Sequence, residues 1–167
     1  MPKRLLVVVG MCLAAVVVLA AAPPKVAPPK KVFVSSLQPR NTAPAVVEMI
    51  DGSVCNAIHG DKRFEPVCPP DIKAILEYDS LNNAFGNSSR CADNDCWGRL
   101  AKRVQAEMML SGSVAKLDKS KFVLTLDLVD VTSAKSLGHV EEQVTGTEEQ
   151  LYKRAEDAVK KLLGQVK

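Results

Sequence analysis

Two neighbouring segments in the second half of the chain limit the fold more than any other feature. Residues 107–117 read EMMLSGSVAKL and residues 121–131 read KFVLTLDLVDV, with a polar turn between them. Side chains on a strand alternate between two sides, and four apolar residues of the second segment share one side: Phe122, Leu124, Leu126 and Leu128. Thr125 and Asp127 fall on the other side, which is half apolar. The segments therefore predict a β-hairpin with one buried face and one partly covered face.

The rest of the chain alternates between strand and helix periods. Short β-rich runs predict strands at residues 32–36, 62–68 and 136–146. Four apolar stripes predict helices: residues 42–59, with Thr42 as the cap, then 69–78, about 95–105, and 147–164, which opens with a T-x-x-Q capping box. The order βαβαα-βββα predicts an α/β (α+β) sandwich, in which helices pack on a mixed sheet of about five strands.

The first 22 residues have the layout of a bacterial secretory signal. Lys3 and Arg4 precede an apolar run and then small residues, but the run of 18 residues is also close to the minimum that spans a bilayer as an uncleaved anchor. Residues 23–31, PPKVAPPKK, predict an extended linker that keeps the domain near a membrane or cell wall. Residues 32–167 then form a single domain. Either form of the signal exports this domain to the periplasm or cell envelope.

The low net charge of the chain argues against a nucleic-acid partner. The formal charge of the chain is +3, and removal of Lys3 and Arg4 with the signal would leave about +1. Nucleic-acid binding depends on neutralising several phosphates with basic side chains, so a nearly neutral domain has no electrostatic basis for it.

The cysteines favour disulfides. Export would leave Cys55, Cys68, Cys91 and Cys96, an even number in an oxidising compartment. Cys91 and Cys96 lie in CADNDC, at the end of a polar loop and in the first turn of a helix, and we expect them to be bonded. Cys55 and Cys68 would then pair by elimination.

Three alternatives for these residues are weaker. A zinc site would need Cys55, His59 and Cys68 as half of its ligands, strung across a helix end and a strand. A thioredoxin-like site needs C-x-x-C, whereas CADNDC has four intervening residues. Calcium binding by residues 93–95 would lack the glycine and the distal glutamate of a known loop. We therefore expect no metal and no cofactor.

Catalytic candidates are few. His59 follows Cys55 by four residues, the helical spacing at which a Cys–His pair meets, but no orienting acid is evident. His139 is expected to face solvent, and no histidine is placed to activate Ser111 or Ser113. We expect no enzyme, with a small exported thiol- or histidine-dependent enzyme as the alternative.

A family resemblance agrees with this interpretation. LSGSVAKLDKSKFVLTLDLVDVTSAKSLGHV, residues 110–140, follows a helix with DCWGRLAKRVQAE and precedes the capped helix. This layout resembles the amino-terminal domain of TolB, and is similar to the curli-secretion lipoprotein CsgG and the periplasmic activators of penicillin-binding proteins. The resemblance covers roughly residues 32–165, but Ala134 replaces the usual turn glycine, no lipobox is present, and no propeller repeats follow.

The resemblance implies a non-catalytic envelope module that works through protein contacts as a scaffold or adaptor. The partner would be another envelope protein, which the sequence does not identify. We expect it to dock on an exposed edge of the sheet or on the face that bears Thr125 and Asp127.

Overall fold

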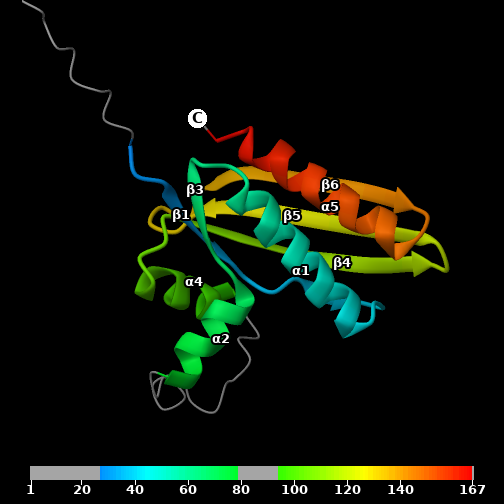
Figure 1. The fold of residues 1–167 in the computed structure, drawn as a ribbon, viewed down its shortest axis with the longest axis horizontal. Helices are drawn as coiled ribbons and strands as arrows, with labels where there is room; N and C mark the ends of the chain where they lie inside the picture. The colour runs from blue at the N-terminus through cyan, green and yellow to red at the C-terminus, as the bar shows by residue number, and fades with distance from the viewer. Residues whose placement is uncertain (1–26, 79–93, 167) are drawn as a thin grey trace, which may run out of the picture.

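The computed structural model describes residues 27–78 and 94–166. In this part of the chain six strands form one sheet, in the order β3-β1-β4-β5-β6 with β2 beside β4 (Figure 1). The strands are β1 (Lys30–Val34), β2 (Gln38–Arg40), β3 (Phe64–Val67), β4 (Met108–Asp118), β5 (Lys121–Asp130) and β6 (Ser136–Thr145). The helices are α1 (Pro44–His59), α2 (Pro69–Tyr78), α4 (Asn94–Arg103) and α5 (Glu148–Leu163). The α/β (α+β) sandwich is confirmed.

The sheet is mixed because its two halves are connected differently. β1 runs parallel to both β3 and β4, whereas β4, β5 and β6 form an antiparallel meander. In the predicted hairpin, Gly112 of β4 pairs with Leu126 of β5. Leu126 also pairs with Val140 of β6 on its other side. As expected, the even-numbered apolar residues of β5 are fully buried and the odd-numbered ones are half-buried.

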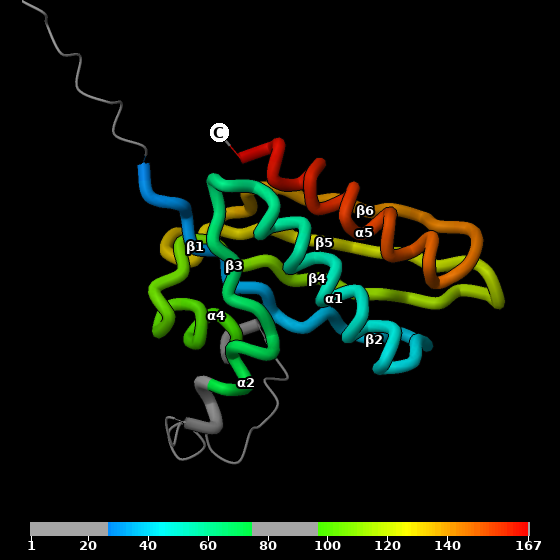
Figure 2. Tube along the Cα trace, in the orientation of Figure 1, coloured from blue at the N-terminus to red at the C-terminus, as the bar shows by residue number. Residues whose placement is uncertain are grey.

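β1 and β2 are two parts of one interrupted strand beside β4 (Figure 2). Val32 pairs with Met108 and Gln38 pairs with Ser113, so β1–β2 uses one residue more than β4 over the same distance. The extra residue makes a β-bulge at residues 35–37. β2 was not predicted from the sequence, because its three residues are all exposed and the middle one is a proline.

Two hydrophobic cores lie on opposite faces of the sheet. The larger core fills the space between one face and the helices α1 and α5, which cross that face side by side (Figure 1). The smaller core joins Phe33 and Met109 to Ile72 of α2 and to Leu100 and Ala101 of α4. This second core covers only one end of its face. The remainder of that face carries half-buried and exposed side chains. We call it the open face, and it includes Ser111, Ser113, Thr125, Asp127, His139 and Glu141.

The predicted N-terminal cap is present on α5 but not on α1. At α5, Thr147 and Gln150 form the predicted capping box, with the Thr147 N–H donating to the Gln150 side chain at 3.0 Å. At α1, Ala43 is the cap residue and no side chain bonds to the helix start, so the predicted Thr42 cap is wrong. The Thr42 hydroxyl instead donates to the carbonyl oxygens of Arg40 and Val114, both at 3.1 Å, and ties β2 to β4.

β1 begins at Lys30, two residues before the start expected for the domain. The Lys30 N–H donates to the Arg63 carbonyl oxygen at 2.8 Å, which fixes the entry of the chain into the sheet. Within residues 27–78 and 94–166, no helix combines the length and the apolar character that crossing a membrane requires.

Candidate functional site

Cys55 and Cys68 form a disulfide that links α1 to the residue before α2. Their Cα atoms are 6.1 Å apart, within the usual range for a disulfide. The Cys55 sulfur is therefore not a free thiol. The predicted Cys91–Cys96 bond lies outside the described side chains and stays a prediction. In the part of the chain that the structure describes, no three His, Cys, Asp or Glu side chains gather where they could hold a metal ion.

The register of the meander aligns polar residues in rows across the open face. One row runs from Ser113 through Thr125 to Glu141. The next row places Asp127 between Ser111 on β4 and His139 on β6. The two residues predicted as a binding surface, Thr125 and Asp127, thus lie side by side in a polar part of the sheet.

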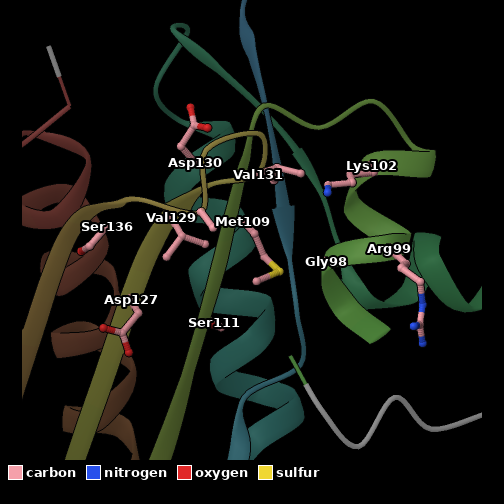
Figure 3. Close-up of a pocket in the computed structure, with 11 residues that line it drawn as sticks. Gly98, Arg99, Lys102, Met109, Ser111, Asp127, Val129, Asp130, Val131 and Ser136 are labelled. Atoms are coloured by element: carbon pink, nitrogen blue, oxygen red, sulfur yellow. The ribbon is translucent and has the colours of Figure 1, made fainter. Parts of the chain in front are cut away.

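A groove runs along the open face beside α4. It consists of a cavity of about 580 Å³ under α4 and an adjoining cavity of about 280 Å³ that reaches β2, and both are lined by Ser111 and Asp127. Thr125 lines the second cavity. Figure 3 shows the first cavity, with strands β4 and β5 on one side and α4 on the other. Both predicted binding residues therefore lie in one groove.

The lining of the groove changes character along its length. Under α4 it contains an apolar patch, formed by Met109, Val129 and Val131, among charged and hydroxyl side chains. Towards β2 it is lined by hydroxyl groups, including those of Ser113 and Thr125. Hydroxyls can donate and accept hydrogen bonds, so this end suits a ligand with both kinds of polar group.

Charged side chains stand on both sides of the groove. The Lys102 amine of α4 points toward the strands, whereas the Arg99 guanidinium points away from them (Figure 3). On the sheet side, Asp127 Oδ1 lies 2.6 Å from Nδ1 of His139, and both side chains are about half exposed, at 44% and 54%. His139 is exposed, as the sequence predicted. Its pairing with Asp127 was not predicted, because only the β5–β6 register brings the two residues together.

Asp130 occupies the rim where β5 turns into β6. Its Oδ1 atom accepts hydrogen bonds from the Ser133 N–H, the Ser133 hydroxyl and the Thr132 N–H. These hydrogen bonds, chiefly those from Ser133, lower the pKa of Asp130. The turn also holds Ala134 at φ 55°, a left-handed conformation that glycine would adopt more easily. The ionised carboxylate of Asp130 therefore stabilises the turn, and its Oδ1 atom is already engaged by Thr132 and Ser133.

Among the described residues, Asp51 is the one charged residue that is buried. Its side chain stabilises the bulge beside the groove. Its two carboxylate oxygens accept hydrogen bonds from the Ser36 hydroxyl at 2.7 Å and from the Leu37 N–H at 3.0 Å. Burial raises the pKa of Asp51 to about 6, in spite of these hydrogen bonds, and the nearby Glu48 charge adds a little. Ser36 itself lines the groove. The sequence offered one signal that was missed, an aspartate within the apolar stripe of α1.

The remaining sequence candidates do not meet at this site. His59 is an exposed residue in the last turn of α1, on the helix that covers the other face of the sheet. Ser111 and Ser113 line the groove, and the close approach of the neighbouring strand explains the glycine between them. A Cβ atom at Gly112 would collide with the Thr125 carbonyl oxygen and would lie 3.1 Å from the Leu37 side chain.

Solved structures from bacteria share this fold at low sequence identity. A dodecamer of a PelC variant from Paraburkholderia phytofirmans aligns with a TM-score of 0.57 and 18% identity, over 87% of this chain and 94% of that one. Lipoprotein GNA1162 from Neisseria meningitidis gives 0.55 and 11%, over 81% and 97%. The LpoB C-terminal domain from Escherichia coli gives 0.52 and 17%, over 76% and 89%.

These similarities establish the fold alone, because all three identities are low. No protein-family model matches the sequence, and no curated protein is significantly similar to it. TolB from Acinetobacter baumannii aligns with a TM-score of only 0.46, which supports no argument. The fold is thus that of the LpoB C-terminal domain and GNA1162, whereas the finer resemblance to CsgG and to activators of penicillin-binding proteins stays a prediction.

Proposed function

We propose that the protein is an exported module of the bacterial cell envelope that acts as a scaffold or adaptor through protein contacts. The observation that carries this proposal is the open face with its groove. Three long strands present rows of polar side chains there, and the groove contains both a hydrophobic end and hydrogen-bonding groups. Protein interfaces combine apolar contacts with hydrogen bonds between polar groups, and this surface offers both.

The fold comparisons agree with this proposal. GNA1162, which shares this fold, is a lipoprotein, and this agrees with a place for the present chain in the cell envelope. The predicted signal and linker, residues 1–31, would bring this chain to the periplasm or hold it at the inner membrane. PelC is described as a dodecamer, so further copies of the chain are one class of partner, next to a different envelope protein.

The alternative, a thiol- or histidine-dependent enzyme, has less support. Its proposed nucleophile, Cys55, is bonded to Cys68. A sulfur in a disulfide cannot act as the thiolate that such catalysis needs. His59 is exposed, and with Cys55 bonded it has no nucleophile at helical spacing to activate.

Site-specific photo-crosslinking in the native envelope tests the proposal. A photoreactive amino acid at Glu141 would sit on the open face and outside the groove, whereas one at Lys153 of α5 would sit on the opposite side of the domain. We expect Glu141 to give a discrete crosslinked product, identified by mass spectrometry as a second copy or another protein, and Lys153 to give none. Crosslinks of equal yield at both positions, or none at Glu141, would contradict the proposal.

A measurement of activity addresses the alternative. Substrate turnover by the purified chain that disappears in His59→Ala, while the fold is retained, would favour the enzyme.

A further inference from the structure

The residues that line the groove along β5 are spaced like the alternate side chains of an extended polypeptide. Thr125, Asp127, Val129 and Val131 line it at every second residue of one strand and the turn that follows. Such residues recur at about 6.6 Å along a strand, so the four positions span about 20 Å. A peptide in the β conformation presents alternate side chains at the same spacing. Several of its side chains can therefore meet successive positions of the groove without a change of conformation.

The chemistry of these positions changes in a fixed order. At one end Met109, Val129 and Val131 form an apolar surface. Two residues back along β5, Asp127 presents a carboxylate whose Oδ1 is engaged by His139, and no hydrogen bond to its Oδ2 is seen among the described residues. An apolar side chain and a cationic side chain two residues apart on a peptide would match these two positions.

The remaining polar groups suit a peptide backbone. The Lys102 amine points toward the strands from the opposite wall and can donate to a carbonyl oxygen (Figure 3). The hydroxyls of Ser111, Ser113 and Thr125 can accept from N–H groups and donate to carbonyl groups. A backbone needs both functions, since each residue carries one donor and one acceptor.

We infer that the groove binds an extended segment of a partner protein, with an apolar side chain on the Met109–Val129–Val131 surface and a Lys or Arg side chain on Asp127. This inference rests on the proposed function and adds to it the place of contact and the kind of segment recognised. The apolar contact supplies most of the affinity, because a partly exposed ion pair contributes little beyond specificity.

A designed peptide tests the inference on the full chain in mild detergent. The capped peptide Ac-Ser-Thr-Lys-Thr-Val-Thr-Ser-amide places Val and Lys two residues apart, and two further peptides replace Lys by Glu or Val by Ser. Binding is measured by NMR titration of the ¹⁵N-labelled chain. We expect saturable shifts at Met109, Ser111 and Asp127, and binding about tenfold weaker for the Glu peptide, which exchanges an attraction for a repulsion.

Reversing the charge at Asp127 tests whether the Lys side chain of the peptide contacts this residue. Asp127→Lys should reverse the preference, so that the Glu peptide binds more tightly than the Lys peptide. Asp127→Asn should bring the two affinities together and serves as the second variant if Asp127→Lys is unstable. A preference for the Lys peptide that is unchanged in both variants would overturn the assignment.

A matched pair of variants tests the groove itself. Ser111 and Ala115 lie on β4 and face the same side, but only Ser111 lines the groove. Ser111→Trp should abolish peptide binding, whereas Ala115→Trp should leave it within about twofold. Absence of binding by the unaltered chain, or equal binding by both variants, would overturn the inference. Glu141 lies on the open face but does not line the groove. A crosslink at Glu141 that persists in Ser111→Trp would therefore overturn the groove as the place of contact and leave the proposed function standing.

Discussion

Asp51 offers the sharpest test of how the structure is stabilised near the groove. The residue is 4% exposed, and its carboxylate accepts hydrogen bonds from Ser36 and from the Leu37 N–H. Asp51→Asn keeps the shape and an acceptor for the Leu37 N–H but removes the charge. Asp51→Ala removes both and leaves a buried N–H without an acceptor.

The raised pKa sets the expected size and sign of the effect. A rise from 3.8 to about 6 corresponds to about 3 kcal/mol of stability lost when the carboxylate is ionised, at about 1.4 kcal/mol per pH unit. The folded protein binds this proton more tightly than the unfolded chain. The contribution is therefore fully present below pH 3.8 and is lost as the pH rises through about 6.

Urea denaturation of both proteins between pH 4 and pH 7.5 measures this contribution. The stability of Asp51→Asn relative to the unaltered chain should increase by about 2 to 3 kcal/mol over that range, since other titrating groups cancel in the difference. Asp51→Ala should be less stable than Asp51→Asn by about 2 to 4 kcal/mol. Glu48→Gln should reduce the pH dependence only slightly, because burial is the larger cause. A difference that is constant with pH would refute the reasoning.

Three further predictions test the cores and the disulfide. Leu126→Ala should cost about 2 to 5 kcal/mol because Leu126 is fully buried, whereas the half-buried Thr125→Ala should cost little, as measured by urea denaturation. Gly112→Ala should destabilise strongly or abolish folding, because its Cβ would meet the Thr125 carbonyl, whereas Gly52→Ala on α1, with open space around it, should stabilise by up to about 1 kcal/mol in circular-dichroism melts. Reducing the disulfide of α1, whose cysteines are 13 residues apart, should lower stability by about 3 kcal/mol, and non-reducing peptide mapping should recover those two cysteines in one linked fragment.

The meander was predictable because its signal is local. The alternation of Phe122, Leu124 and Leu126 fixes which side of β5 is buried without reference to any other part of the chain. The last helix was predictable for the same reason, since its capping box and apolar stripe lie within one segment. The same alternation correctly placed Thr125 and Asp127 on the less buried side.

The groove was not predictable, because it depends on packing between distant segments. Asp127 and His139 meet only when the β5–β6 register is known, and that register follows from the length and conformation of the turn. Lys102 reaches the groove only because α4 crosses one end of the sheet, which its apolar stripe alone does not specify. β2 lacked any signal of burial, and its place beside β4 depends on the bulge.

The bulge connects the stability of the domain with the groove. A buried carboxylate that lowers stability at neutral pH is unusual in a core, and such features occur more often at functional sites than elsewhere. Here Asp51 holds Ser36, which lines the groove, through a hydrogen bond of 2.7 Å. If the bulge shapes the β2 end of the groove, Asp51→Asn should retain peptide binding while Asp51→Ala weakens it, even at temperatures where both variants are fully folded. Equal affinities of the two folded variants would mean that Asp51 serves the sheet alone.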